Sequence, residues 1–274
     1  MQPGSLSDWL AGLSVPAIAI GTFALMLISA AGGQLVRRAA GRRARHREQE
    51  TESSVAQEGY LLGGVLGLLG LLLGFTFGMA LSRYETRREL VTQEANAIGT
   101  AYLRAQLLDE PHRGALSKLL VNYTENRIQL ATARAGAGDY LRRNDALLVE
   151  IWANVKASRD SAAAHGLTTA LLTTFNEVID LDAKRKIAWD LRVPVEVLLL
   201  IIVYLGVTAA VVGRQVDGPR GKRAALVLFL LVSLSITIIA DLNRPVSGHA
   251  RESQKAMIML LETLKSQPPQ LFDR

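Results

Sequence analysis

Side chains that commonly perform catalysis are few in this chain, and they do not fall into catalytic patterns. The sequence has no cysteine and four histidines, which excludes thiolate chemistry and zinc sites built on sulfur. No HExxH motif, phosphate-binding loop or nucleophile elbow occurs. We therefore expect no catalytic residue, no metal site and no cofactor, and we expect that the protein is not an enzyme. The scattered histidines are interpreted as surface residues: His46, His112, His165 and His249.

The uncharged apolar run at 60–82 contains three large apolar residues at helical spacing. Leu71, Phe75 and Met79 follow one another at i, i+4 and i+8 and therefore share one face of a helix. In an oligomer, a ring of these side chains would form a hydrophobic pore constriction, which can gate ions by dewetting. Contact with lipid or with the protein core is the alternative, and it is the commoner role of apolar residues in a membrane helix.

The same run carries a glycine stripe, at steps of three or four residues, which fall on one side of a helix. Such a stripe lets another backbone approach closely. Helix packing within or between subunits is the main interpretation, and a pore lined by glycine backbone is the alternative. The stripe consists of Gly63, Gly67, Gly70, Gly74 and Gly78.

A dense run of polar residues begins where this apolar run ends, at 83–100. Its position at the end of a span predicts a polar vestibule of a pore, or an interface with a partner helix. A solvated face held by salt bridges within the helix is the alternative. The candidate vestibule or interface residues are Arg83, Tyr84, Arg87, Arg88, Glu94, Asn96 and Arg104.

Three further ionisable residues lie at the edges of other apolar runs: Glu196, Asp241 and Arg244. Ionisable groups at a membrane edge usually pair. For Asp241 we expect a bridge to an arginine of 83–88. Glu196 is either a functional acid or the partner of Arg192 one turn earlier.

The elements that position these residues are four apolar runs, at 15–36, 60–82, 193–212 and 224–240. A bilayer core about 30 Å thick requires roughly 20 residues of helix. The sequence predicts an all-α integral membrane protein with four transmembrane helices in two pairs and a helical soluble region between the pairs. The predicted segments are an N-terminal tail and first transmembrane helix at 1–36, a basic loop at 37–59, the second transmembrane helix at 60–82, the soluble region at 83–192, a transmembrane hairpin of helices three and four at 193–243, and a C-terminal segment packing on the soluble region at 244–274.

Within the soluble region, apolar residues recur at helical spacing and glycine or proline marks the breaks. No such breaker separates residues 82 and 83, so the second span is expected to continue into the soluble region as one helix. We expect similar continuity at 192–194, with Pro194 opening the third span or kinking it. The helices are predicted near 83–109, 112–134, 139–163 and 167–192.

The net charge of +6 is concentrated beside the spans, where it suits lipid headgroups rather than nucleic acid. The N-terminal tail has no lysine or arginine, whereas six arginines follow the first span. This asymmetry favours a soluble region and termini outside the cell. Basic residues at the opposite membrane face oppose that orientation, so the side of the soluble region stays open.

The segments 70–104 and 241–245 resemble those of the bacterial bestrophin-like domain family, and the resemblance extends over about 55–265. Its most specific part is Glu-Ala-Asn-Ala-Ile-Gly-Thr at 94–100. The family is named for its similarity to bestrophins, which are pentameric ion channels with two span pairs around a helical soluble region. The long acidic calcium clasp of animal bestrophins is missing here.

The resemblance implies a homo-oligomeric ion channel, with a pentamer expected by analogy, in the bacterial cytoplasmic (inner) membrane. Its partners would be the lipid bilayer and a permeant inorganic ion. The second span would line the pore, with Leu71, Phe75 and Met79 at its hydrophobic neck. Bestrophins place the soluble region in the cytosol, opposite to the orientation that the charges favour. A non-conducting membrane scaffold or sensor, which binds a partner through its soluble helices, is the alternative function.

Overall fold

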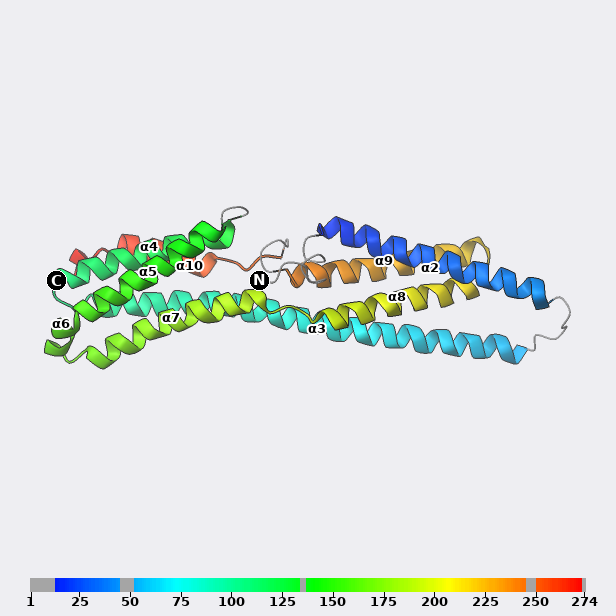
Figure 1. Ribbon diagram of the computed structural model, residues 1–274, viewed down its shortest axis with the longest axis horizontal. Helices are drawn as coiled ribbons and strands as arrows, with labels where there is room; N and C mark the ends of the chain where they lie inside the picture. Colours follow the sequence, from blue (N-terminus) through cyan, green and yellow to red (C-terminus); the bar gives the residue numbers. More distant parts are fainter. Residues whose placement is uncertain (1–12, 45–51, 134–136, 245–249, 273–274) are drawn as a thin grey trace. The chain divides into compact units, whose positions relative to one another are not determined.

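The computed structural model describes residues 13–44, 52–133, 137–244 and 250–272 (Figure 1). Every regular element in these ranges is helical. The elements are α2 (Val15–Ala44), α3 (Glu52–Ala105), α4 (His112–Thr132), α5 (Ala137–Ala157), α6 (Arg159–Ala164), α7 (Thr168–Asp190), α8 (Val195–Gln215), α9 (Gly218–Leu242), α10 (Lys255–Ser266) and the 3-10 helix η1 (Pro269–Phe272). The predicted N-terminal tail up to residue 12 lies outside the described residues.

Four helical stretches are long and apolar enough to cross a membrane, and their most apolar windows have a mean hydropathy of 2.0 to 2.6. They contain α2, the first part of α3, α8 and α9. The protein is therefore an all-α integral membrane protein with four transmembrane helices in two pairs. The helical region lies between the pairs in the sequence, which confirms the predicted fold class.

The predicted basic loop at 37–59 is wrong for most of its length. Helix α2 continues through Arg37 to Ala44, and α3 already begins at Glu52. Alanine and arginine are strong helix formers, and a helix outside the hydrocarbon needs no apolar residues. Hydropathy therefore marked the end of the span rather than the end of the helix. Residues 45–51 lie outside the described part of the chain.

Two other predicted helices are interrupted. Helix α7 ends at Asp190 and is followed by extended Leu191, whereas Pro194 caps the start of α8 at Val195. The α conformation is also disfavoured for Val193, because it precedes proline. The Asn243 Oδ1 atom accepts the N–H of Val193 at 2.7 Å. The predicted helix at 139–163 is broken at Ser158, whose hydroxyl donates to the Val155 carbonyl at 2.9 Å.

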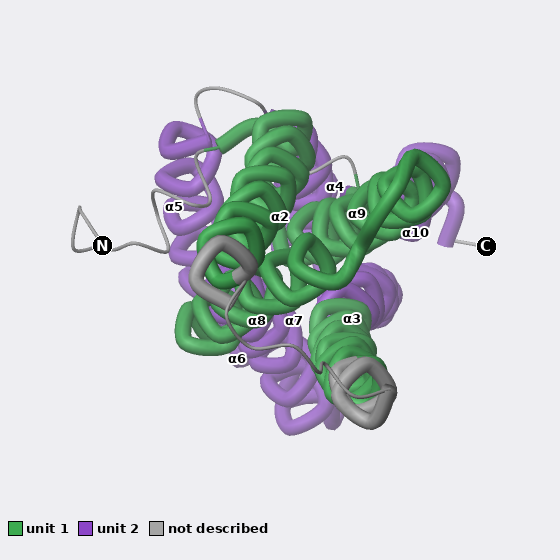
Figure 2. Tube along the Cα trace, turned by 90° about the vertical axis from the view of Figure 1, so that its right-hand side faces the viewer, with its two compact units in different colours: residues 1–82, 192–244, 248–250 green, residues 83–191, 245–247, 251–274 purple. Residues whose placement is uncertain are grey.

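The structure divides into two compact units, coloured separately in Figure 2. Unit 1 contains α2, α3 up to Ser82, α8 and α9, and unit 2 contains α3 from Arg83 onward, α4 to α7 and α10. As the sequence predicts, α3 passes residues 82 and 83 without a break and is a single helix of 54 residues.

Unit 1 is held by close contact of α2 with α8 and α9. A Cβ atom added to Gly33 would collide with the Ala210 carbonyl, and one added to Gly213 would collide with the backbone of Ala30. Small residues spaced in this way let two membrane helices approach closely. The buried side chains around this crossing include Met26, Leu69, Leu205 and Phe229.

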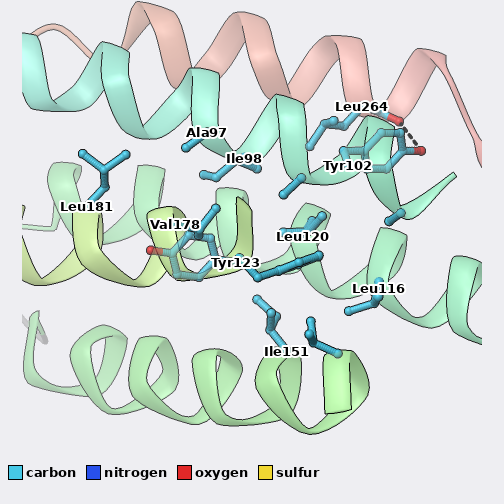
Figure 3. Close-up of a cluster of buried hydrophobic side chains, with 14 of the residues drawn as sticks. Ala97, Ile98, Tyr102, Leu116, Leu120, Tyr123, Ile151, Val178, Leu181 and Leu264 are labelled. Atoms are coloured by element: carbon cyan, nitrogen blue, oxygen red, sulfur yellow. Dashed lines mark hydrogen bonds between the residues drawn. The ribbon is translucent and has the colours of Figure 1, made fainter. Parts of the chain in front are cut away.

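Unit 2 has an apolar core between α3, α4, α5, α7 and α10 (Figure 3). Ile98, Leu120 and Ile151 are fully buried there. The C-terminal segment contributes Met257 and Leu264 to the same core. The Tyr102 hydroxyl donates to the Gln267 carbonyl at 2.6 Å, so α3 and the end of α10 are joined by a hydrogen bond as well as by apolar contact.

The α2–α8 crossing generates the first prediction. We expect Gly213→Ala to lower the free energy of unfolding by about 1–3 kcal/mol, because the methyl group meets backbone that cannot move aside. Thermal unfolding of the purified protein in detergent measures the change. Gly32→Ala is the matched control on α2, where a Cβ meets nothing within 4 Å. It should be neutral or slightly stabilising, and an equal loss in both variants would contradict the contact.

Candidate functional site

The long helix α3 has a covered side and an uncovered side. Successive residues of a helix are rotated by about 100°, so residues three or four positions apart share a side. Buried positions of α3 follow this spacing from the transmembrane part into unit 2. They include Leu69, Thr76, Ala80, Arg87, Val91, Glu94, Ile98, Ala101 and Ala105, and in unit 2 Ala95, Ala97 and Tyr102 beside this stripe are buried as well. Most residues on the opposite side are exposed.

The transmembrane part of the uncovered side carries the predicted glycine stripe. Gly63, Gly67, Gly70, Gly74 and Gly78 are all exposed, and a Cβ added to any of them would meet nothing within 4 Å. Within the described residues these glycines therefore pack against no other helix of the same chain. These glycines can therefore pack closely against a helix of a neighbouring subunit, or their backbone can line a pore.

The predicted constriction residues are divided between two environments. Leu71 is 54% exposed and Phe75 is 68% exposed, beside the glycine stripe. Met79 is half-buried and packs against the cluster formed by Ala80, Val193 and Ile239. Two large apolar side chains therefore project from the uncovered side, and the third belongs more to the packing of unit 1.

The uncovered side becomes polar beyond the span. Its exposed residues there include the predicted Arg88 and Asn96. Sequence reasoning did not single out their exposed neighbours Glu89, Thr92 and Gln93, of which Gln93 donates to the Glu89 carboxylate at 2.9 Å. The helical period of the glycine stripe, extended past residue 82, would have identified them.

Three of the predicted vestibule residues instead make contacts within unit 2, and a fourth is half-buried. Arg87 forms a buried ion pair with Glu252, with 2.7 Å between Nε and Oε1. The Tyr84 hydroxyl donates to the Arg251 carbonyl at 3.4 Å. Arg104 donates to the Ala170 carbonyl at 2.7 Å and to the Thr174 hydroxyl. Arg83 is half-buried. These contacts are typical of residues that hold helices together rather than line an opening.

Glu94 is also on the covered side, and it is completely buried. Its carboxylate accepts the Tyr123 hydroxyl at 2.7 Å and lies 2.9 Å from Arg127 Nε. Arg185 Nη1 donates to its other oxygen. A carboxylate enclosed in this way cannot line a vestibule, and we interpret it as a structural ion pair.

A second buried acid completes the charge network. Asp182 accepts Asn144 Nδ2 at 2.9 Å and pairs with Arg127 Nη1 at 3.1 Å and with Lys186 Nζ at 2.7 Å. The Arg127 guanidinium also lies over the Trp189 ring, 5.7 Å from its centroid. The network therefore joins α3, α4, α5 and α7.

The charges around Glu94 determine its protonation. Burial raises the pKa of this carboxyl, but the Arg127 and Arg185 guanidiniums and the Tyr123 hydrogen bond outweigh burial and hold the pKa below its ordinary value. Burial and the neighbouring Glu94 carboxylate raise the pKa of Tyr123 well above its usual range. Glu94 is accordingly ionised and Tyr123 is a neutral hydrogen-bond donor at neutral pH.

The three membrane-edge residues have separate surroundings. Glu196 is exposed in the first turn of α8. Asp241 Oδ2 accepts the Ala250 N–H at 3.0 Å. Arg244 is buried and donates to the Leu13 carbonyl. The predicted pairs of Asp241 with an arginine of 83–88 and of Glu196 with Arg192 stay predictions.

One surface cluster contains the residue types of a hydrolase triad but has a different order. Asp109 accepts the Ser161 hydroxyl at 2.8 Å and lies 3.2 Å from His165 Nε2. The acid therefore stands between the serine and the histidine, whereas a base must contact the nucleophile directly. In the described part of the chain, no group of three or more His, Asp or Glu side chains could hold a metal ion.

Comparison with known proteins places these features in a family. A sequence model of the Bestrophin-like domain matches residues 24–257. Among solved structures, the chain is similar to two single-substitution variants of a bacterial bestrophin homologue from Klebsiella pneumoniae. The first has a TM-score of 0.64 and 13% identity, over 96% of this chain and 99% of that chain. The second has a TM-score of 0.62 and 14% identity, over 93% and 99%. No curated protein matches the sequence.

The buried network generates the second prediction. Glu94→Gln should lower the free energy of unfolding by about 3–5 kcal/mol, because buried Arg185 loses its carboxylate partner and buried Arg127 keeps only Asp182. Thermal or denaturant unfolding of the purified protein measures this loss. The matched control is Glu85→Gln, which changes an exposed carboxylate on the same helix and should leave stability unchanged within about 0.5 kcal/mol.

The same pair of variants should differ in acid. Because the folded-state pKa of Glu94 is below its ordinary value of 4.5, its stabilisation is complete above pH 4.5 and is lost as the pH falls through the lowered pKa. Glu94→Gln removes this component of the acid dependence, whereas Glu85→Gln keeps it. Identical acid profiles for the wild type and Glu94→Gln would show that the network does not control acid stability.

Proposed function

We propose that this chain, which belongs to the Bestrophin-like domain family, is the subunit of an ion channel whose pore is lined by the uncovered side of α3. The assembly is a homo-oligomer, with five subunits as its expected number. It lies in the bacterial cytoplasmic membrane, where its partners are lipid and a permeant inorganic ion.

The observation that carries this proposal is the uncovered side of α3. A Cβ added to any glycine of the stripe meets nothing within 4 Å in the described part of the chain, and Leu71 and Phe75 are 54% and 68% exposed. A ring of identical subunits would direct these surfaces toward its axis. The small glycines allow backbones to approach, and the large side chains narrow the opening.

The change of residue type along this side also supports conduction. Apolar Leu71 and Phe75 lie within the span, and the exposed polar residues Arg88, Glu89 and Asn96 lie beyond it. A hydrophobic constriction followed by a polar entrance is a common arrangement in ion channels. In this proposal Leu71 and Phe75 form the constriction, Met79 supports it, and Arg88 and Asn96 line the entrance.

The third prediction concerns the constriction. Phe75→Ala should increase ion flux through the purified oligomer in liposomes by about tenfold, if the ring contributes about 1.4 kcal/mol to the barrier. Chloride, sodium and potassium gradients are compared, and the subunit number is measured by native mass spectrometry. Leu230→Ala is the control, since Leu230 is 60% exposed on α9, away from the proposed pore.

One outcome would contradict the channel and another the constriction. A monomer or a two-fold dimer without flux would favour the scaffold or sensor that binds a partner through its soluble helices. Equal effects of Phe75→Ala and Leu230→Ala would place the constriction elsewhere in the channel.

The fourth prediction concerns the polar entrance. Arg88 is exposed on the uncovered side, so a ring of Arg88 side chains attracts anions and repels cations. Arg88→Gln should lower the ratio of chloride to potassium permeability several-fold at low salt, and the effect should shrink as ionic strength rises. Reversal potentials in bilayers measure this ratio. Arg143→Gln, an exposed position on α5, is the control and should leave the ratio unchanged. An unchanged ratio in Arg88→Gln would remove Arg88 from the ion path.

A further inference from the structure

Unit 1 contains a cavity that the proposed pore does not use. Its volume is about 280 Å³, and residues of α2, α8 and α9 line it, whereas none of its lining residues belongs to α3. Most of its wall is apolar, including Ile18, Leu25, Leu205 and Ile236. The cavity therefore lies among the membrane helices α2, α8 and α9.

One end of the cavity is polar and carries two positive charges. Arg192, Asn243 and Arg244 line it there, where α2 begins, α8 begins and α9 ends. Asn243 is occupied by the Val193 N–H, and Arg244 is fixed by its hydrogen bond to the Leu13 carbonyl. Fixed positive groups at the mouth of an apolar cavity favour a ligand with an anionic end and an apolar body.

The two guanidiniums also raise each other's electrostatic energy. Burial is the largest cause that lowers the pKa of Arg244; Asp241 raises this pKa, and Arg192 lowers it by a smaller amount. A ligand anion near both side chains would compensate the burial of Arg244 and the charge of Arg192. The N-terminal ends of α2 and α8 lie at the same end of the cavity, and helix N-termini favour negative charge.

The dimensions fit one hydrocarbon chain. At a rise of 1.5 Å per residue, Leu25 and Leu205 lie about 15 Å beyond the first residues of their helices. This depth is about half of the hydrocarbon core of a bilayer. A cavity of about 150 Å³ accommodates benzene, so a cavity of this volume accommodates a chain of roughly ten to twelve carbons.

We propose that this cavity binds an acidic phospholipid of the surrounding bilayer, with one acyl chain between α2, α8 and α9 and its phosphate group at Arg192 and Arg244. Arginine is well suited to this role because its planar guanidinium donates two parallel hydrogen bonds to a phosphate. The second acyl chain stays in the bilayer, since the cavity has room for one chain.

The cavity offers a substitution that blocks the chain without changing charge. Gly21 lines the cavity, and a Cβ added there meets nothing within 4 Å. Gly21→Leu therefore fills the cavity without disturbing the helix contacts. Gly32→Leu is the matched control, because Gly32 lies on the same helix, has the same open surroundings and is absent from the cavity wall.

The test is lipid retention by the full-length protein, purified in detergent, delipidated and then mixed with phosphatidylglycerol or phosphatidylcholine of matched chains. Native mass spectrometry counts bound lipid. We expect phosphatidylglycerol to be retained about tenfold more than phosphatidylcholine, and this preference to be lost in Arg192→Gln, since an ionic hydrogen bond contributes about one such factor. Gly21→Leu should lose retention of both lipids, whereas Gly32→Leu should retain them like the wild type.

A second charge control is Arg223→Gln, at an exposed position in the first part of α9, at the opposite end of that helix from the cavity mouth. It should keep the preference for phosphatidylglycerol. Equal retention of the two lipids by the wild type, or unchanged retention in Gly21→Leu, would overturn the proposal. Retention of a free fatty acid such as laurate without retention of phosphatidylglycerol would also overturn it. Each result is independent of ion flux, so it stands whether or not the protein conducts.

Discussion

The helical region of this protein depends on a carboxylate that no water reaches. Glu94 is completely buried, and it is stable there only because Arg127 and Arg185 compensate its charge. Breaking such a cluster leaves an uncompensated buried charge. Since the partners come from α4 and α7, one ion-pair network fixes the positions of three helices. The apolar core around Ile98 stabilises the packing of these helices, but apolar contacts are not directional and do little to fix their orientation.

The same carboxylate lies on the covered side of α3. Leu69 and Ala80, which are buried within unit 1, share this side of the helix with Glu94. The glycine stripe, Phe75 and Asn96 are exposed on the opposite side of the same uninterrupted helix. Each unit buries its own part of the covered side. The proposed pore surface and the structural ion pair are two sides of one helix.

The sequence predicted the fold class well because hydropathy, glycine and proline report directly on spans and breaks. The sequence did not show that Glu94 is buried and Asn96 exposed. The guanidiniums that surround Glu94 are distant in the chain, and without them the two polar residues have the same local pattern. The glycine stripe was assigned to helix packing within or between subunits; within the described chain the close helix contact is at Gly33 and Gly213 instead, and packing of the stripe between subunits stays a prediction. A pattern of small residues shows where backbones can approach, but only the partner helix decides whether they do.

The members of the ion-pair network are far apart in the sequence, and this separation determines the order in which parts of the protein fold during synthesis. Arg185 is translated 91 residues after Glu94, which is about 5–18 s at common rates of synthesis. The second span can enter the bilayer during this interval, while Glu94 still needs water around it. The core of unit 2 also requires Met257 from α10, which is made after α9. The helical region therefore completes its folding only after the last membrane helix has been synthesised, and a ribosome-bound chain that lacks α10 is an unfinished domain attached to an inserted anchor.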